Sequence, residues 1–204
     1  MIGILDYKVG NLKNVKTAVK KLGYEAVISD KKNVLEKTDG LILPGVGAFR
    51  DSIEMLDRSG LHDFLDKWVS QNRFLLGICL GMQLLFDKSY EMGTHRGLMY
   101  IPGEVVKFSR EKKIPHMGWN ELFFKKSDPL INNINEGDYV YFVHSYYVSA
   151  DNPSCIAYTN YGENAAAIVK KNNIYGAQFH PEKSADTGLQ ILKNYLDIVQ
   201  NAKE

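Results

Sequence analysis

The feature that most constrains the fold of this chain is a series of short apolar runs, separated by segments with helical periodicity. The runs at residues 2–5, 41–43 and 74–78 contain no charged side chain. A strand that is apolar on both faces is typical of a parallel sheet, because the helices that connect parallel strands cover both faces. The first half of the chain therefore predicts a doubly wound α/β fold.

The helices of the first half are predicted from the spacing of their apolar residues. Within residues 11–22 four apolar residues recur at helical spacing, and Gly23 follows as a C-cap. Further helices are expected at residues 48–56, 61–69 and 80–86, and a further strand at residues 25–28.

From about Met99 the pattern changes to short strands joined by turns. Strands are expected at residues 100–108, 119–124, 139–148, 156–159, 165–169 and 174–179, and a closing helix at residues 184–200. No linker rich in proline, glycine or serine separates the two halves. We therefore expect one domain, residues 1–204, with three layers: a single mixed, mostly parallel sheet with helices on both faces.

Composition excludes several classes of function. The chain has 25 basic and 24 acidic residues, so no bulk field attracts nucleic acid or an anionic membrane. Its two cysteines, Cys79 and Cys155, lie far apart with no second pair, which permits neither a disulfide framework nor a four-ligand zinc site. His116 and His144 lack metal-ligand partners at useful spacing and are interpreted as structural. Because the sequence has no signal-peptide pattern and no long apolar run, we expect a soluble cytoplasmic protein. We also expect no metal and no cofactor.

The first candidate for chemistry is Cys79. An apolar strand leads directly into Gly77-Ile78-Cys79-Leu80-Gly81, and a helical pattern follows without a spacer. This is typical of a nucleophile elbow, in which flanking glycines permit a tight turn that exposes the central side chain. The alternative is that Cys79 is a small buried hydrophobic residue, as most free cysteines are.

A thiol that attacks an amide needs a group that protonates the leaving amine. His180 and Glu182 follow a predicted strand, where their side chains can reach the end of a neighbouring strand. Glu182 can accept a hydrogen bond from the imidazole and fix its tautomer, while the other ring nitrogen faces the thiol. For His180 alone, a structural role at the strand end is the alternative, but the three residues together favour catalysis.

At this point the residues resemble a known family. Gly-Ile-Cys-Leu-Gly-Met-Gln at 77–83 and Gln-Phe-His-Pro-Glu at 178–182 resemble the class I, or triad, glutamine amidotransferases. Further motifs resemble the glutaminase subunits of imidazole glycerol phosphate synthases: Asp6-Tyr7 with Gly10-Asn11-Leu12, and the segments at 44–49, 115–120, 142–146 and 180–184. The resemblance spans nearly the whole chain and implies a flavodoxin-like fold.

The resemblance implies a role for each site residue. Cys79 would attack the side-chain carboxamide of glutamine and form a thioester, and His180, oriented by Glu182, would protonate the departing ammonia and then activate water. Backbone N–H groups of Val46 or Gly47 and of Leu80 would stabilise the oxyanion. Residues that would bind glutamine are Gln83, by its side chain, and Ser145 and Tyr146, by their main chains.

The resemblance also implies a partner. In the family the ammonia passes into a (β/α)₈-barrel cyclase subunit, with which this chain would form a heterodimer for histidine biosynthesis. The residues placed on the docking face are Asn11, Trp119, Tyr141 and Lys183. Taken without the resemblance, the pattern around Trp119 and Tyr141 predicts core residues instead.

Other interpretations remain open at this level. A closely similar subunit could supply ammonia for amidating a nucleotide-linked or surface-glycan sugar, and Lys8, where the family usually has glycine, bears on the choice of partner because it lies near Asn11. A catalytically silent regulatory or binding subunit is an alternative of another class, which the intact Cys79, His180 and Glu182 argue against. A cysteine peptidase or redox-sensing thiol protein would not need Gln83.

Overall fold

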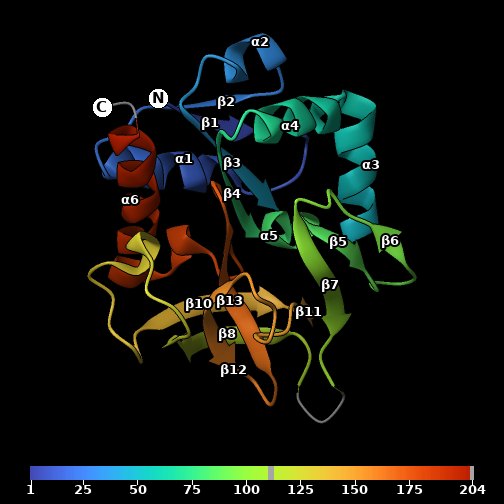
Figure 1. Cartoon of the computed structure of the whole chain (residues 1–204), viewed down its shortest axis with the longest axis vertical. Helices are drawn as coiled ribbons and strands as arrows, with labels where there is room; N and C mark the ends of the chain where they lie inside the picture. Colours follow the sequence, from blue (N-terminus) through green and yellow to red (C-terminus); the bar gives the residue numbers. More distant parts are fainter. Residues whose placement is uncertain (110–112, 203–204) are drawn as a thin grey trace.

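The computed structural model describes residues 1–109 and 113–202, and an eight-stranded sheet forms its centre (Figure 1). Five neighbouring strands are parallel and the last three are antiparallel. In spatial order they are β2 Ala26–Ser29, β1 Ile2–Leu5, β3 Gly40–Gly45, β4 Phe74–Cys79, β14 Ile174–Ala177, β13 Asn164–Lys171, β12 Cys155–Asn160 and β9 Phe123–Phe124. The predicted α/β fold with a mixed, mainly parallel sheet is confirmed.

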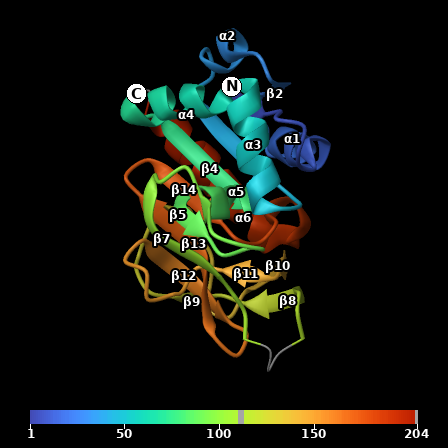
Figure 2. The same cartoon turned by 90° about the vertical axis from the view of Figure 1, so that its right-hand side faces the viewer.

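Helices cover both faces of the parallel part of this sheet (Figures 1 and 2). Helices α1 (Leu12–Lys21) and α6 (Ala185–Asn201) pack on one face, and α3 (Phe49–Ser59) and α4 (Leu61–Ser70) pack on the other. A short helix, α2 (Lys32–Leu35), which the sequence did not predict, contacts β1 and β2. No helix within the described residues is long and apolar enough to cross a membrane.

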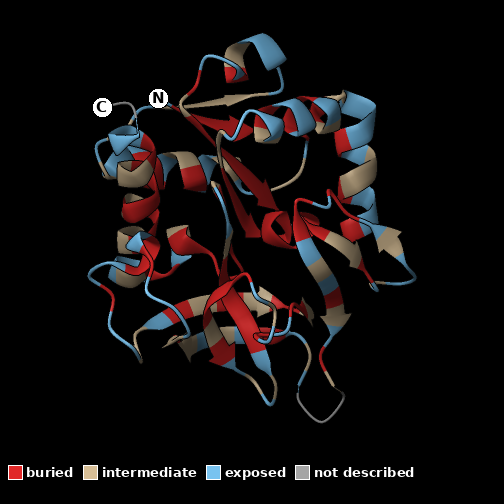
Figure 3. Ribbon diagram, viewed as in Figure 1, coloured by how far each residue is buried: buried red, intermediate tan, exposed pale blue. Residues whose placement is uncertain are grey.

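The central strands explain why their sequences are apolar throughout. Along β3 and β4, Ile42 and Leu76 enter the hydrophobic core beneath α1 and α6, whereas Leu41, Leu43 and Leu75 enter the core beneath α3 and α4. Successive side chains of a strand point to opposite faces, so both sets are buried (Figure 3). Each fully buried leucine or isoleucine stabilises the fold by about 1.5–3 kcal/mol.

Two smaller sheets lie beside the antiparallel end of the central sheet, so the expectation of one sheet was wrong. One pairs β8 (His116–Glu121) with β10 (Tyr139–His144). The other contains, in order, β11 Tyr146–Tyr147, β7 Ile101–Lys107, β5 Phe86–Ser89 and β6 His95–Arg96. The predicted strand at 139–148 is broken at Ser145, which passes the chain from one small sheet to the other.

Two boundaries near these sheets also differ from the prediction. The helix expected at residues 80–86 ends at Leu84, because Phe86 begins β5 and pairs with β7. The strand expected at residues 119–124 is two strands, since Leu122 separates β8 from β9 and they join different sheets. In both cases the boundary depends on which strand pairs with the segment, and the pattern of polar and apolar residues does not show this.

Candidate active site at the end of strand β4

Cys79 lies at the junction of β4 and α5 (Leu80–Leu84), as the elbow pattern predicted. Its backbone adopts φ 56°, a left-handed conformation that is costly for a residue with a side chain. The flanking glycines contribute space: a Cβ on Gly77 would lie 2.5 Å from the Gly81 carbonyl oxygen, and one on Gly81 would lie 1.8 Å from the Leu43 oxygen. Gly77 and Gly81 are therefore required by close packing. The unusual backbone conformation is adopted by Cys79 itself.

His180 and Glu182 lie beside the elbow because β14 pairs in parallel with β4, Ala177 opposite Ile78. The Nδ1 atom of His180 lies 3.0 Å from Oε1 of Glu182. Both side chains are buried, 4% and 1% exposed. Because a carboxylate accepts the Nδ1 proton, the Nε2 atom of His180 is the nitrogen available to the thiol.

The charge state of His180 follows from these partners. Burial by itself lowers the pKa of the imidazole, but hydrogen bonds to Cys79 and Glu182 outweigh it and raise the pKa to about 9. His180 is therefore protonated at neutral pH and can donate a proton from Nε2. A protonated imidazole beside a thiol is the arrangement used for nucleophilic attack on a carbonyl carbon.

A cavity of about 310 Å³ opens onto these groups. Its volume lies at the lower end of the range for small-molecule sites. The predicted residues on its wall are Val46, Gly47, Cys79, Leu80, Gln83, His180 and Lys183, and three others are Glu91, Val143 and His144.

Gln83 is held by two hydrogen bonds on its nitrogen. Its Nε2 donates to the Tyr146 carbonyl at 2.8 Å and to Oε1 of Gln178 at 2.9 Å, which leaves Oε1 of Gln83 as an acceptor. Ser145 and Tyr146 do not line the cavity, and the Ser145 carbonyl accepts from Phe108 N–H at 3.3 Å. The contacts of these two main chains with glutamine stay a prediction.

The loop that carries Val46 and Gly47 follows β3. The Tyr7 hydroxyl donates to the Pro44 carbonyl at 2.7 Å and fixes the start of the loop. Gly47 has φ 91°, and Val46 is 43% exposed. The oxyanion role of this loop and of Leu80 also stays a prediction.

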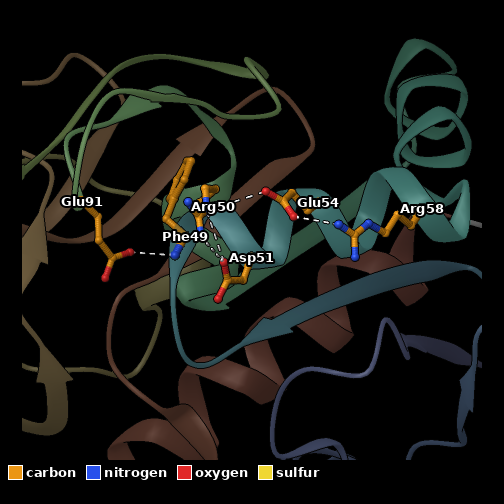
Figure 4. Close-up of polar contacts among 6 residues, drawn as sticks. All are labelled: Phe49, Arg50, Asp51, Glu54, Arg58 and Glu91. Carbon is orange, nitrogen blue, oxygen red and sulfur yellow. Dashed lines mark hydrogen bonds and ion pairs between the residues drawn. The ribbon is translucent and has the colours of Figure 1, made fainter.

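Glu91 is a cavity residue that the sequence did not reveal. Its carboxylate accepts from the Phe49 N–H at 2.7 Å, at the start of α3 (Figure 4). This contact ties the loop after β5 to the segment after Gly47. A single glutamate in a loop carries no motif, so only the fold shows that it lies near Cys79.

Two of the predicted docking residues lie on the small sheet of β8 and β10. Trp119 and Tyr141 are opposite each other on β8 and β10, with ring centroids 6.0 Å apart, and Trp119 is 50% exposed. The interpretation of Trp119 as a core residue was therefore wrong. Met117 and Tyr139 belong to the same strand faces and are 62% and 50% exposed. We call Met117, Trp119, Tyr139 and Tyr141 the aromatic patch.

The other two predicted docking residues are also exposed. Asn11 precedes the first residue of α1, and Lys183 lies at the cavity wall, one residue after Glu182. Lys8 adopts φ 69°, which explains why glycine is suited to this position.

Comparison with known proteins agrees with this geometry. The family description "Glutamine amidotransferase class-I" matches residues 3–198, and the chain belongs to that family. The chain is also similar at full length to proteins called imidazole glycerol phosphate synthase subunit HisH. That of Caldanaerobacter subterraneus subsp. tengcongensis is 47% identical over 98% of this chain and 99% of its own, and that of Carboxydothermus hydrogenoformans is 50% identical over 98% and 100%.

Solved structures support the fold. A crystal structure described as a glutamine amidotransferase superimposes with a TM-score of 0.75 at 20% identity, covering 98% of each chain. A structure of PurLQS from Thermotoga maritima gives a TM-score of 0.74 at 20% identity, covering 97% of this chain and 98% of that one. At this identity the likeness concerns the fold alone.

Proposed function

We propose that the chain acts as one glutaminase domain that hydrolyses glutamine to glutamate and ammonia. The observation that carries the proposal is that Cys79 and His180 line one small cavity, while Glu182 contacts Nδ1 of His180 from behind it. Intact catalytic groups argue against a silent regulatory subunit. A glutamine-sized cavity with Gln83 on its wall argues against a peptidase, which needs an open groove for a chain.

The reaction follows from the proton positions. The Cys79 sulfur attacks the side-chain carboxamide carbon of glutamine, and His180 gives its Nε2 proton to the nitrogen, so that ammonia leaves and a thioester remains. Water then attacks the thioester while Nε2 takes up a proton, and glutamate is released. Glu182 holds the imidazole in place throughout.

The wall of the cavity also supports an amino acid as substrate. Glu91 and Lys183 both line the cavity and carry opposite charges, which suits the ammonium and carboxylate groups of glutamine. The Val46 or Gly47 N–H and the Leu80 N–H would stabilise the oxyanion.

We further infer that the chain works in the cytoplasm as one half of an imidazole glycerol phosphate synthase. Its partner is a (β/α)₈-barrel cyclase that uses the ammonia in histidine biosynthesis. The support is the full-length identity to HisH subunits and the aromatic patch, whose exposed apolar side chains suit an interface. These relatives favour histidine biosynthesis over sugar amidation.

The test is a Cys79→Ala variant assayed with the barrel partner for glutamate release. We expect at least a thousandfold loss, because the nucleophile is removed. Cys155→Ala is the matched control, since Cys155 is the other free cysteine and burial raises its pKa to about 11, which keeps it unreactive. Glutamate release by Cys79→Ala at the wild-type rate would refute the proposal.

A further inference from the structure

Two buried histidines beside the cavity have no part in the reaction just described. His116 on β8 and His144 on β10 are paired across the two strands and are 2% and 6% exposed. Nδ1 of His116 lies 3.0 Å from Nε2 of His144. Their side chains point to the face of the small sheet opposite the aromatic patch, because they alternate with Met117 and Val143 along the strands.

The proton on each nitrogen can be assigned from the partners. The Tyr146 carbonyl, 2.9 Å from Nδ1 of His144, can only accept, so this Nδ1 carries the proton. Burial lowers the pKa of His116 to about 4 and that of His144 to about 3, so both are neutral at neutral pH. Nε2 of His144 is then an acceptor, and Nδ1 of His116 donates to it.

The chain of hydrogen bonds continues to the end of β8. Nε2 of His116 accepts from Nδ2 of Asn120 at 3.3 Å. Nδ2 of Asn120 also donates to the Asn160 carbonyl at 2.9 Å. Oδ1 of Asn120 accepts from the Glu121 N–H at 2.9 Å. A rotated Asn120 amide would lose these bonds. The chain therefore runs in one direction, from Asn120 through His116 and His144 to the Tyr146 carbonyl.

That carbonyl decides how Gln83 is oriented. The pair formed by Gln83 and Gln178 has two possible arrangements, because the Nε2 of Gln178 has no hydrogen-bond partner among the described residues and both amides could rotate together. The Tyr146 carbonyl, which requires a donor from Gln83, selects one of them. Tyr146 lies in the two-residue edge strand β11, so its position depends on contacts outside its own sheet.

We propose that His116 and His144 are positioning residues for glutamine binding: their hydrogen bonds hold the Tyr146 carbonyl, which fixes the Gln83 amide with its oxygen toward the cavity. The proposal rests on the proposed glutaminase function. It gives a role to the His-Met-Gly-Trp-Asn segment at 116–120 that docking alone does not explain. It also joins β8, which carries part of the aromatic patch, to a residue on the cavity wall.

The test measures the KM for glutamine of the complex with its cyclase partner. His144→Leu removes the donor to Tyr146, and we expect the KM to rise about tenfold, the effect of losing one well-placed hydrogen bond. His144→Asn keeps an N–H where Nδ1 stands, and we expect its KM to lie within about threefold of the wild-type value. His62→Leu, which alters a histidine that contacts the exposed Asp57, is the matched control.

A second variant avoids dependence on the folding of His144→Leu. His116→Phe keeps the ring that stacks on Phe142 and Tyr161, at 4.8 and 4.0 Å between centroids, but removes its N–H. We expect its KM to rise about threefold to tenfold. The rate of Cys79 alkylation by iodoacetamide, which does not depend on Gln83, stays within about twofold in every variant if the role is positioning.

Three results would overturn the proposal. One is a KM within twofold of the wild type for both His144→Leu and His116→Phe. Another is a His144→Asn variant as impaired as His144→Leu, and the third is an alkylation rate that falls in parallel with glutamine affinity. A wild-type complex that releases no glutamate would instead refute the proposed function.

Discussion

His180, next to the Cys79 elbow, and the pair of His116 and His144 on the small sheet are all buried, but they differ in their affinity for protons. His180 has its pKa raised to about 9, whereas His116 and His144 have theirs lowered to about 4 and about 3. Burial lowers the pKa of all three. The difference lies in the partners, because Glu182 and Cys79 face His180, whereas amide, carbonyl and imidazole groups face the pair.

This difference separates a proton that must move from protons that must stay. In the proposed reaction, the Nε2 proton of His180 is the one given to the leaving ammonia. The protons of His116 and His144 define a fixed direction of hydrogen bonding, and a change of charge on either ring would break it.

The largest expected effect comes from making His180 resemble the other two histidines. Glu182→Gln keeps an acceptor for Nδ1 but removes the negative charge, so the pKa of His180 falls and the proton donor is lost. We expect kcat/KM for glutamine hydrolysis to fall about a thousandfold. Glu54→Gln, on the exposed face of α3, is the matched control. A loss of less than tenfold would show that the carboxylate does not create the difference.

A smaller effect is expected in the pH dependence of the wild-type complex. His180 loses its proton as the pH rises through about 9, so the rate of glutamate release should fall about tenfold between pH 8 and pH 10. His116 and His144 are neutral throughout this range and contribute nothing to the decline. A decline centred near pH 6.5 would mean that Glu182 and Cys79 do not raise the pKa of His180.

The smallest expected effect is on stability between pH 7 and pH 6. Neutral, buried His116 and His144 stabilise the fold above the unfolded pKa of about 6.5, and this stability is lost as the pH falls toward their folded pKa values. His180 acts in the opposite direction, because its raised pKa stabilises the fold below about pH 6.5 and this stability is lost as the pH rises through about 9.

Urea unfolding at the two pH values separates these contributions. The double variant His116→Phe/His144→Leu should lose about 1 kcal/mol less stability than the wild type when the pH is lowered from 7 to 6. An equal loss in both proteins would show that the two histidines are not kept neutral by the fold.

The central sheet and the triad could be predicted from the sequence for a shared physical reason. Both depend on short segments whose own residues restrict the outcome: apolar strands that need two covered faces, and a cysteine between glycines that must turn tightly. Cys79, His180 and Glu182 met as predicted because parallel neighbours bring their carboxyl ends together.

The rest depends on pairing between distant segments. The bond between His116 and His144 requires the register of β8 on β10, and the exposure of Trp119 requires that one face of this pair lack a covering layer. Glu91 reaches the cavity only because β5 pairs with β7, and the charged residues of β5 hide that strand in the sequence. None of these three features has a recognisable pattern in the local sequence.

The direction of the hydrogen-bond chain also restricts which substitutions the protein can accept during evolution. A substitution that turns a donor into an acceptor at Asn120, His116 or His144 opposes the next link, which then has two donors or two acceptors facing each other. The three positions are therefore expected to vary together or to remain fixed, although only His144 lies on the cavity wall.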